Sequence, residues 1–220
     1  MDSERDSDAE TPRAPADDLA LVARLRARDR DAFGALVDRL HAPLLRMARN
    51  YVASEASAEE VVQETWVGVL TGLATFEGRS SLKTWIFRIL VNRAKSRGVR
   101  EARSVPFSAT EPDDPRDPAV DPARFRDNDA WASPPEWWED GTPEKLLRDH
   151  QTAALVLRAM DSLPERQRIV VTLRDVEGFD ADEVRNILGI RETNQRVLLH
   201  RARSKLRAEL ERIVSGGRVC

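Results

Sequence analysis

Apolar residues recur at spacings of three and four along two separate stretches of this chain. The first stretch covers residues 19–103 and the second covers residues 144–214. This spacing places apolar side chains on one face of an α-helix, so both stretches predict helices that pack through such faces. Residues 104–143 hold eight of the twelve prolines and show no helical period, which is typical of a linker. We therefore expect an all-α chain with two small helical domains.

The first domain is predicted to hold four helices, and each of them starts at an Asp or Ser. These side chains cap helices by accepting a backbone N–H bond. The first helix is expected to start at Asp17 or Asp18, and the second near Asp31. The third is expected to start at Ser57, where the glutamate three residues later completes a capping box. Pro43 predicts a bend or break in the second helix, because proline removes a backbone donor.

A fourth, basic helix is predicted after Gly78, which breaks the chain, with Ser80 or Ser81 as its cap. Residues 79–103 carry eight Lys or Arg and one acid. Such a concentrated positive face is the electrostatic footprint of a nucleic-acid site. The inward faces of the third and fourth helices are expected to comprise Val61, Val62, Thr65, Trp66, Val69 and Leu70, then Leu82, Trp85, Ile86, Ile89 and Leu90.

The second domain contains a short helix, a glycine and then a basic helix. Asp180 is expected to cap the short helix, and Gly189 accepts the left-handed backbone with which a helix ends. Thr193 or Asn194 is then expected to cap the basic helix. This order predicts a helix-turn-helix at about residues 180–199, whose second helix enters the major groove of DNA.

The net charge of −3 conceals two basic domains. Residues 1–18 carry seven acids and two arginines, and residues 104–143 carry ten acids and three arginines. Removing their net charges of −5 and −7 from the total leaves +9. Blocks of like charge are usually tails or linkers. We therefore expect residues 1–18 to form a disordered acidic tail, and residues 215–220 to form a second tail.

Chemistry beyond nucleic-acid binding is sparse. Cys220 is the single cysteine, which excludes an internal disulfide and a cysteine zinc cluster. The histidines His41, His150 and His200 are scattered, so we predict no metal site, no cofactor and no catalytic residues. No run reaches the roughly 20 apolar residues of a membrane span, and residues 1–10 do not form a signal peptide. These observations predict a cytoplasmic protein that is not an enzyme.

Two separate motifs resemble those of a known family. LPERQRIVVTLRDVEGFDADEVRNILGI, followed by LLHRARSKLR, resembles the last conserved region of bacterial sigma factors. AEEVVQETWVGVL and FEGRSSLKTWIFRILVN resemble their second region. With only these two regions and a variable linker, the chain is similar to the extracytoplasmic-function (ECF) group of the sigma-70 family. The resemblance implies a subunit that binds core RNA polymerase, directs it to promoter DNA and helps open the duplex, with an anti-sigma protein as a possible further partner.

The resemblance also implies three groups of contact residues. Acidic and amide groups of the third helix, with one tryptophan, would dock on polymerase, and complementary charge steers such an encounter. The loop and basic helix after residue 76 would hold the minus-ten element as it melts. The helix-turn-helix would read the duplex minus-thirty-five element. In that order, the groups are Glu59, Glu60, Gln63, Glu64 and Trp66; Arg79, Ser80, Ser81, Lys83, Thr84, Arg88, Asn92 and Lys95; and Arg191, Glu192, Thr193, Asn194, Arg196, Arg201, Arg203 and Lys205.

One segment departs from the commoner family pattern. The family usually has a glycine, a threonine and an apolar residue where this chain has Thr193, Asn194 and Gln195. The basic helix is therefore expected to start or sit differently, and base specificity cannot be carried over from other members. Val197 and Leu198 are apolar residues beyond the main stripe of that helix. Packing is the expected role, and the alternative is that one of them contacts a thymine methyl or the polymerase.

Two other functions fit part of the sequence. A helix-turn-helix regulator that acts without polymerase would explain residues 180–199, but it leaves the second basic module unexplained. A helical interaction protein without DNA function would leave the positive face of residues 79–103 unexplained. Polymerase-dependent promoter binding separates the sigma-factor interpretation from the first alternative, and a salt-dependent gel shift tests the second.

Overall fold

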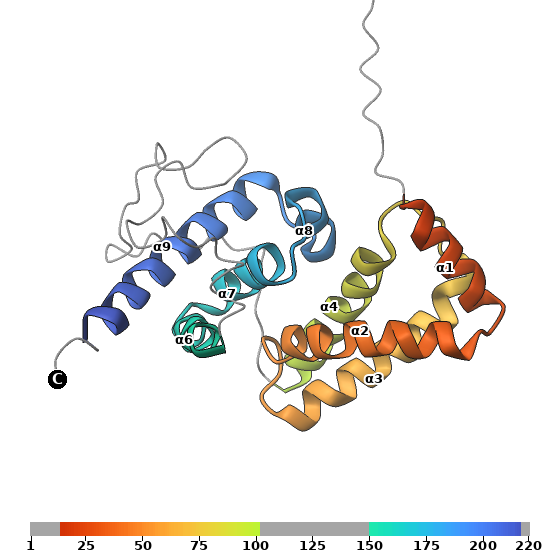
Figure 1. Ribbon diagram of the computed structural model, residues 1–220, viewed down its shortest axis with the longest axis horizontal. Helices are drawn as coiled ribbons and strands as arrows, with labels where there is room; N and C mark the ends of the chain where they lie inside the picture. The colour runs from red at the N-terminus through yellow and green to blue at the C-terminus, as the bar shows by residue number, and fades with distance from the viewer. Residues whose placement is uncertain (1–13, 102–149, 217–220) are drawn as a thin grey trace, which may run out of the picture.

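Two helical lobes in contact make up the computed structural model, which describes residues 14–101 and 150–216 (Figure 1). Every regular element within these ranges is helical, so the predicted all-α class is confirmed. The predicted linker and most of both predicted tails, including Trp131, Trp137, Trp138 and Cys220, lie outside the described residues.

The two lobes follow one another along the chain (Figure 1). The N-terminal lobe comprises α1 (Ala16–Arg26), α2 (Arg30–Ala48), α3 (Glu55–Gly72), the short 3-10 helix η1 (Leu73–Thr75) and α4 (Leu82–Arg100). The C-terminal lobe comprises α6 (His150–Asp161), α7 (Glu165–Val171), the π-helical segment η4 (Thr172–Val176), α8 (Ala181–Leu188) and α9 (Glu192–Gly216).

The core of the N-terminal lobe lies between α2, α3 and α4. Leu44, Ile86 and Leu90 are fully buried, and each such side chain contributes roughly 1.5–3 kcal/mol to folding. Val69 is also buried, but its neighbour Leu70 is 54% exposed. The prediction that Leu70 faces inward is therefore wrong, because one residue is about 100° of rotation around a helix of 3.6 residues per turn.

The start of α1 differs from the prediction in a way that serves α4. α1 begins after Pro15 with no side-chain cap bond, so Asp17 and Asp18 lie in its first turn and neither is the cap. Proline is well placed at such a start because its missing N–H needs no partner there. Asp18 Oδ2 instead accepts a hydrogen bond of 2.6 Å from the backbone N–H of Leu82. One orphan donor of α4 is thereby satisfied.

α2 and α3 start earlier than predicted. Asp29 caps α2, with its Oδ1 accepting a backbone N–H bond at 3.0 Å, so the predicted cap at Asp31 is wrong. Ser54 caps α3 by accepting the N–H of Ser57 at 3.1 Å, so the predicted capping box at Ser57 is also wrong. In both cases an equally good capping side chain lay two or three residues upstream. α2 runs through Pro43 as one helix, which excludes the predicted break, and the alternative of a bend stays a prediction.

The helix-turn-helix has the predicted outline. Asp180 caps α8 within a capping box, and Gly189 ends α8 with a φ of +70°, which confirms both predictions. α9 begins at Glu192, so the predicted cap at Thr193 or Asn194 is wrong and both residues lie in the first helical turn. Gly189, Ile190 and Arg191 alone connect α8 to α9.

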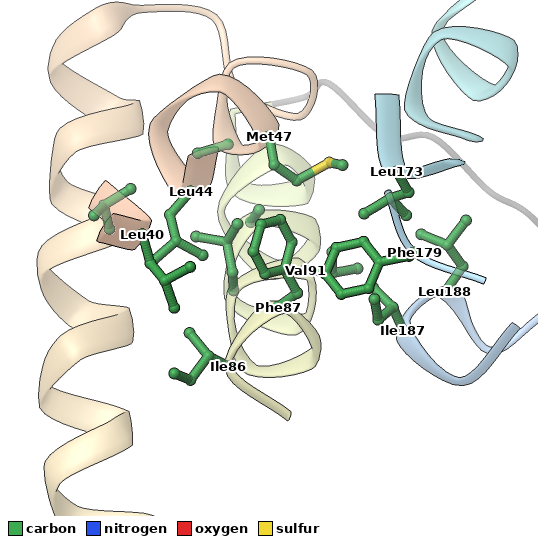
Figure 2. Close-up of a cluster of buried hydrophobic side chains, with 14 of the residues drawn as sticks. Leu40, Leu44, Met47, Ile86, Phe87, Val91, Leu173, Phe179, Ile187 and Leu188 are labelled. Carbon is green, nitrogen blue, oxygen red and sulfur yellow. The ribbon is translucent and has the colours of Figure 1, made fainter. Parts of the chain in front are cut away.

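The two lobes pack against each other through an apolar contact that the sequence analysis did not predict. The rings of Phe87 on α4 and Phe179 before α8 meet edge to face, with centroids 4.8 Å apart and an interplanar angle of 70°. Figure 2 shows Leu173, Ile187 and Leu188 around Phe179 on the side of the C-terminal lobe. All five side chains are buried. The core of the N-terminal lobe thus continues across the boundary into the C-terminal lobe.

Among the residues that the structure describes, no helix combines the length and the apolar character that crossing a membrane requires.

Candidate nucleic-acid interface

The loop that leads into α4 is held by the N-terminal end of the described chain. Gly78 adopts a φ of +70°, and its carbonyl accepts a hydrogen bond of 2.8 Å from the N–H of Ala14. Few residues other than glycine accept this left-handed backbone. Arg79 projects from the fixed loop with a 78% exposed side chain and forms an ion pair with Glu77. The loop therefore presents a cation to solvent beside the first turn of α4.

Two hydroxyls mark the first turn of α4. Ser81 is the N-cap, with its Oγ accepting the N–H of Thr84 at 3.1 Å, which confirms one of the two predicted caps. Both hydroxyls also donate to Oε1 of Glu183 in the C-terminal lobe, at 3.0 Å from Ser81 and 2.6 Å from Thr84. Thr84 is buried in this arrangement. A carboxylate of the helix-turn-helix thus lies on the start of the basic helix.

Three cations of α4 are also turned toward the C-terminal lobe. Lys83 and Lys95 donate to backbone carbonyls, and Arg88 donates to an amide oxygen. Burial lowers the pKa of both lysines, and for Lys83 the nearby Glu177 and Glu183 act in the opposite direction. The bonds are Lys83 Nζ to Glu177 O at 2.6 Å, Arg88 Nη1 to Asn186 Oδ1 at 3.2 Å, and Lys95 Nζ to Leu188 O at 3.0 Å.

The predicted minus-ten residues are therefore divided into two sets by the structure. Arg79 and Asn92 are exposed, and Ser80 is half-buried with its hydroxyl donating to the carbonyl of Ser81. The other five residues are brought together by the C-terminal lobe, which contacts each of them. They are Ser81, Lys83, Thr84, Arg88 and Lys95.

The start of α9 presents polar side chains at the end of the helix-turn-helix. Arg191, Glu192, Thr193 and Arg196 are exposed, and Asn194 is half-buried. Glu192 forms ion pairs of 3.6 Å with Arg185 and 3.7 Å with Arg196, which link α8 to α9. The first turn of α9 is therefore accessible to a ligand such as the edge of a duplex.

The later basic residues of α9 lie closer to the body of the lobe. Arg201 and Lys205 are half-buried. Arg203 was predicted as a phosphate contact. Its guanidinium donates two hydrogen bonds, of 2.7 and 3.0 Å, to the carboxylate of Asp175 in η4, and its side chain is only 14% exposed. Leu198 is buried as expected, whereas Val197 is 46% exposed, so packing accounts for only one of the two. Gln195, in the segment that departs from the family pattern, is fully buried.

A family model matches the greater part of each lobe. The model described as sigma-70 region 2 matches residues 36–104, and the model described as sigma-70, region 4 matches residues 153–206. The chain belongs to the sigma-70 family. Its relatives place it in the ECF group of that family, as the sequence motifs predicted. It is accordingly an RNA polymerase sigma factor that acts in transcription initiation, and its lobes are region 2 and region 4.

Curated relatives align along most of this sigma factor. The ECF RNA polymerase sigma-E factors of Salmonella typhimurium and of Escherichia coli K12 are each 29% identical over 197 residues, covering 90% of this chain and 96% of theirs. The RNA polymerase sigma-H factor of Pseudomonas aeruginosa is 27% identical over 194 residues, covering 88% of this chain and 94% of its own. CnrH, solved in complex with the cytosolic domain of CnrY, shares the fold with a TM-score of 0.53 at 23% identity, over 88% of this chain and 97% of its own.

Helix α3 of region 2 carries the predicted polymerase-docking residues. Glu59, Glu60, Gln63 and Glu64 are exposed on one face of the helix. Trp66 is buried instead, at 8% exposure, and its ring meets the ring of Phe33 edge to face, with centroids 5.8 Å apart. The exposed face also includes two apolar residues, Val67 at 59% and Leu70 at 54% exposure, that the sequence analysis did not assign to it.

A groove of about 380 Å³ between α3 and α4 holds a second group of cations that the sequence analysis did not separate from the rest of the basic helix. Arg93 pairs with Glu64 at 3.4 Å, and Arg97 pairs with Glu60. These arginines and Arg100 recur at spacings of four and three, which places them on one face of α4. That spacing was the signal available in the sequence, because it places these three arginines on a different face of α4 from Lys83 and Lys95.

No group of three or more His, Cys, Asp and Glu side chains that could hold a metal gathers anywhere in the part of the chain that the structure describes.

Proposed function

We propose that this sigma factor docks on core RNA polymerase through the exposed face of α3. Acidic and amide side chains of this face would meet basic residues of the partner, which steers the encounter and fixes the register. The exposed Val67 and Leu70 would supply the apolar centre that a stable interface needs. The ion pairs of Glu60 and Glu64 with α4 arginines would hold both carboxylates in place before docking.

In the same proposal, α4 and the loop before it hold one strand of the minus-ten element as the duplex melts. A single strand needs cations along its backbone and pockets or rings that accept an unstacked base. Lys83, Arg88 and Lys95 lie along one side of α4, and Arg79 projects from the loop at its start. The hydroxyls of Ser81 and Thr84 are at the N-terminal end of the helix, where backbone N–H groups favour a phosphate.

Region 4 would read the duplex minus-thirty-five element through the start of α9. Arg191 and Arg196 can pair with guanine, and Asn194 can pair with adenine. Arg201 and Lys205 would contact phosphates, which position the helix without specifying a base. Arg203 would combine such a contact with its bond to Asp175, which fixes α9 on η4.

The proposal is supported above all by the occurrence of both family regions in order along the chain. The region 2 lobe presents an acidic helix and a basic helix, and the region 4 lobe presents a helix-turn-helix. The test is run-off transcription with core polymerase and this chain on a library of genomic fragments. Discrete transcripts that depend on the chain, and that share an upstream sequence, are expected. Promoter binding by the chain without polymerase, together with an absence of transcripts, would favour a conventional helix-turn-helix regulator instead.

An anti-sigma protein stays a predicted partner. The structural relative CnrH was solved in complex with the cytosolic domain of CnrY, and a search for a bound protein in purified preparations of this chain would test the prediction.

A further inference from the structure

Val197 is an exposed apolar residue on α9, the helix that the proposed function assigns to duplex DNA. Its exposed fraction is 46%, whereas the adjacent Leu198 is 2% exposed. Among the described residues of region 4, Leu157 on α6 is the other large apolar residue that is exposed. A β-branched side chain loses rotamer freedom in a helix, so valine is not a favourable choice at an exposed helical position. Packing explains Leu198 but does not explain Val197.

The buried residues of α9 fix which side of the helix Val197 occupies. Gln195 and Leu199 are 0% and 1% exposed, and each lies two positions from Val197. Because one residue corresponds to about 100° around a helix, two positions place Val197 about 200° away from each of them, on the side opposite the core. Gln195 belongs to the segment that departs from the family pattern, so that departure does not turn Val197 inward.

The side chains around Val197 on this outer side are polar or cationic. Thr193 and Arg201 lie four positions before and after it, which places them one turn away on the same face. Thr193 and the adjacent Arg196 are exposed, and Arg201 is half-buried. Val197 is therefore a single apolar contact point within the surface that would face the bases.

The major groove offers one apolar group that suits such a side chain. Thymine presents its C5-methyl group there beside the O4 acceptor, and the patterns of guanine, cytosine and adenine consist of hydrogen-bonding groups. The apolar centre of a protein interface, by contrast, is formed by several residues within a polar rim. One valine surrounded by polar groups matches a methyl group better than it matches such a centre.

We propose that Val197 contacts the methyl group of a thymine in the minus-thirty-five element and so determines part of the base specificity of region 4. This inference rests on the proposed reading of the duplex by α9. Val197 lies in the second turn of α9, within the N-terminal part of a recognition helix that reaches base edges. Arginines such as Arg196 select hydrogen-bonding groups, whereas a valine adds a preference for the methyl group of thymine.

Deoxyuridine in place of thymine tests the inference, because it removes the methyl group and keeps the O4 acceptor and the base pairing. The probe is a fluorescein-labelled duplex with the promoter that the run-off experiment returns. Each thymine of its minus-thirty-five element, on either strand, is replaced singly. The protein is the full chain bound to core polymerase. We expect one of these replacements to weaken binding about fourfold, the effect of exposing one apolar group of the size of a CH₂.

Val197→Ala removes the protein side of the same contact and introduces a better helix former. This variant should bind the thymine duplex about fourfold more weakly than the wild type does, with no further loss on the deoxyuridine duplex, because both changes remove one contact. Leu157→Ala is the matched control, because Leu157 is 45% exposed but lies on α6. It should keep the wild-type affinity and the wild-type preference for thymine.

Equal affinity of the wild type for the thymine duplex and for every deoxyuridine duplex would overturn the inference, as would a minus-thirty-five element without an A·T pair. A Val197→Ala variant that keeps the wild-type preference for thymine would overturn it too, because another residue then detects the methyl group. Failure of the proposed function has a different signature. In that case a scrambled minus-thirty-five element would bind the wild type as tightly as the recovered element does.

Discussion

Gly34 and Gly189 have different backbone conformations, so alanine in their places should affect stability in opposite ways. Gly34 lies inside α2, where its missing side chain costs backbone entropy, and Gly189 ends α8 with a left-handed φ of +70°. An added Cβ would meet no atom within 4 Å at either position. Sterics with neighbours are therefore the same for both, and only the backbone conformation differs.

Replacing each glycine by alanine should change the stability in opposite directions. Gly189→Ala should destabilise region 4 by about 1 kcal/mol, because an L residue is strained in the left-handed region. Gly34→Ala should stabilise the chain by up to about 1 kcal/mol, because alanine is the better helix former. Thermal unfolding of the two variants beside the wild type measures both effects. A stabilising Gly189→Ala would contradict the described turn of the helix-turn-helix.

Arginines on α9 offer a second residue-scale prediction. Arg203 makes a two-bond contact with Asp175 at 14% exposure, whereas Arg212 pairs with Glu209 at 73% exposure. Arg203→Ala should cost about 1–3 kcal/mol, because it leaves a partly buried carboxylate without its partner. Arg212→Ala should leave the unfolding midpoint unchanged, since exposed pairs contribute little. Equal midpoints for the two variants would show that Asp175 does not anchor α9.

At the scale of elements, α3 and α4 are tied together at the end of α4 by Glu101. Its carboxylate accepts bonds from Ser57 Oγ at 2.7 Å, Arg97 Nε at 3.0 Å and the N–H of Ala53 at 3.2 Å. The hydrogen bond from Ser57, followed by those from Arg97 and Ala53, lowers the pKa of Glu101 below its ordinary value of 4.5. Ionised Glu101 is therefore favoured in the folded chain.

This lowered pKa predicts how stability depends on pH. The contribution of Glu101 is fully present above 4.5, its ordinary pKa, and is lost as the pH falls through the lower pKa of the folded state. Glu101→Gln should therefore be less stable than the wild type near neutral pH, and the difference should shrink below pH 4.5. Urea unfolding of both proteins across this range measures the difference. A difference that stays constant on acidification would contradict the assigned role of the carboxylate.

The sequence predicted those helix ends that a single residue determines, and it missed features that depend on contacts with other parts of the chain. The cap at Asp180 and the turn at Gly189 were predicted because one residue type decides each of them. The starts of α2 and α3 were misplaced because several Asp and Ser residues compete within a few positions, and only the folded chain selects one. Phe87 was not predicted as a core residue because its partner, Phe179, lies in the other lobe.

At the scale of the whole molecule, the same limitation hid the packing of the lobes. The charge pattern predicted two basic domains, but not that Glu183 of one would accept bonds from two hydroxyls of the other or that Glu177 would pair with Arg46. The contacts join residues about a hundred positions apart, across a segment without helical period. For α3, the family resemblance assigned the acidic residues that are exposed, but it also included the buried Trp66 and left out the exposed Val67 and Leu70.

At the same scale, the proposed polymerase contact can be tested without disturbing the contact between the lobes. Glu59 and Gln63 are the preferred positions, because changing them leaves the ion pairs of Glu60 and Glu64 intact. The double variant Glu59→Lys with Gln63→Lys should bind core polymerase about tenfold more weakly, since it removes the net negative charge of the face. Asp38→Lys, an exposed change on α2, is the control and should bind as the wild type does. Retention of polymerase on the immobilised chain measures the binding of the wild type, the double variant and the control.

The central claim is that α4 of region 2 holds the melted promoter strand, and permanganate reactivity of promoter thymines in the presence of core polymerase tests it most directly. Arg79 and Asn92 are exposed, so the double variant Arg79→Ala with Asn92→Ala should leave the packing of the lobes intact. We expect it to lower the reactivity of the melted thymines about tenfold while the closed complex forms as with the wild type. Thymines as reactive as with the wild type would contradict the claim.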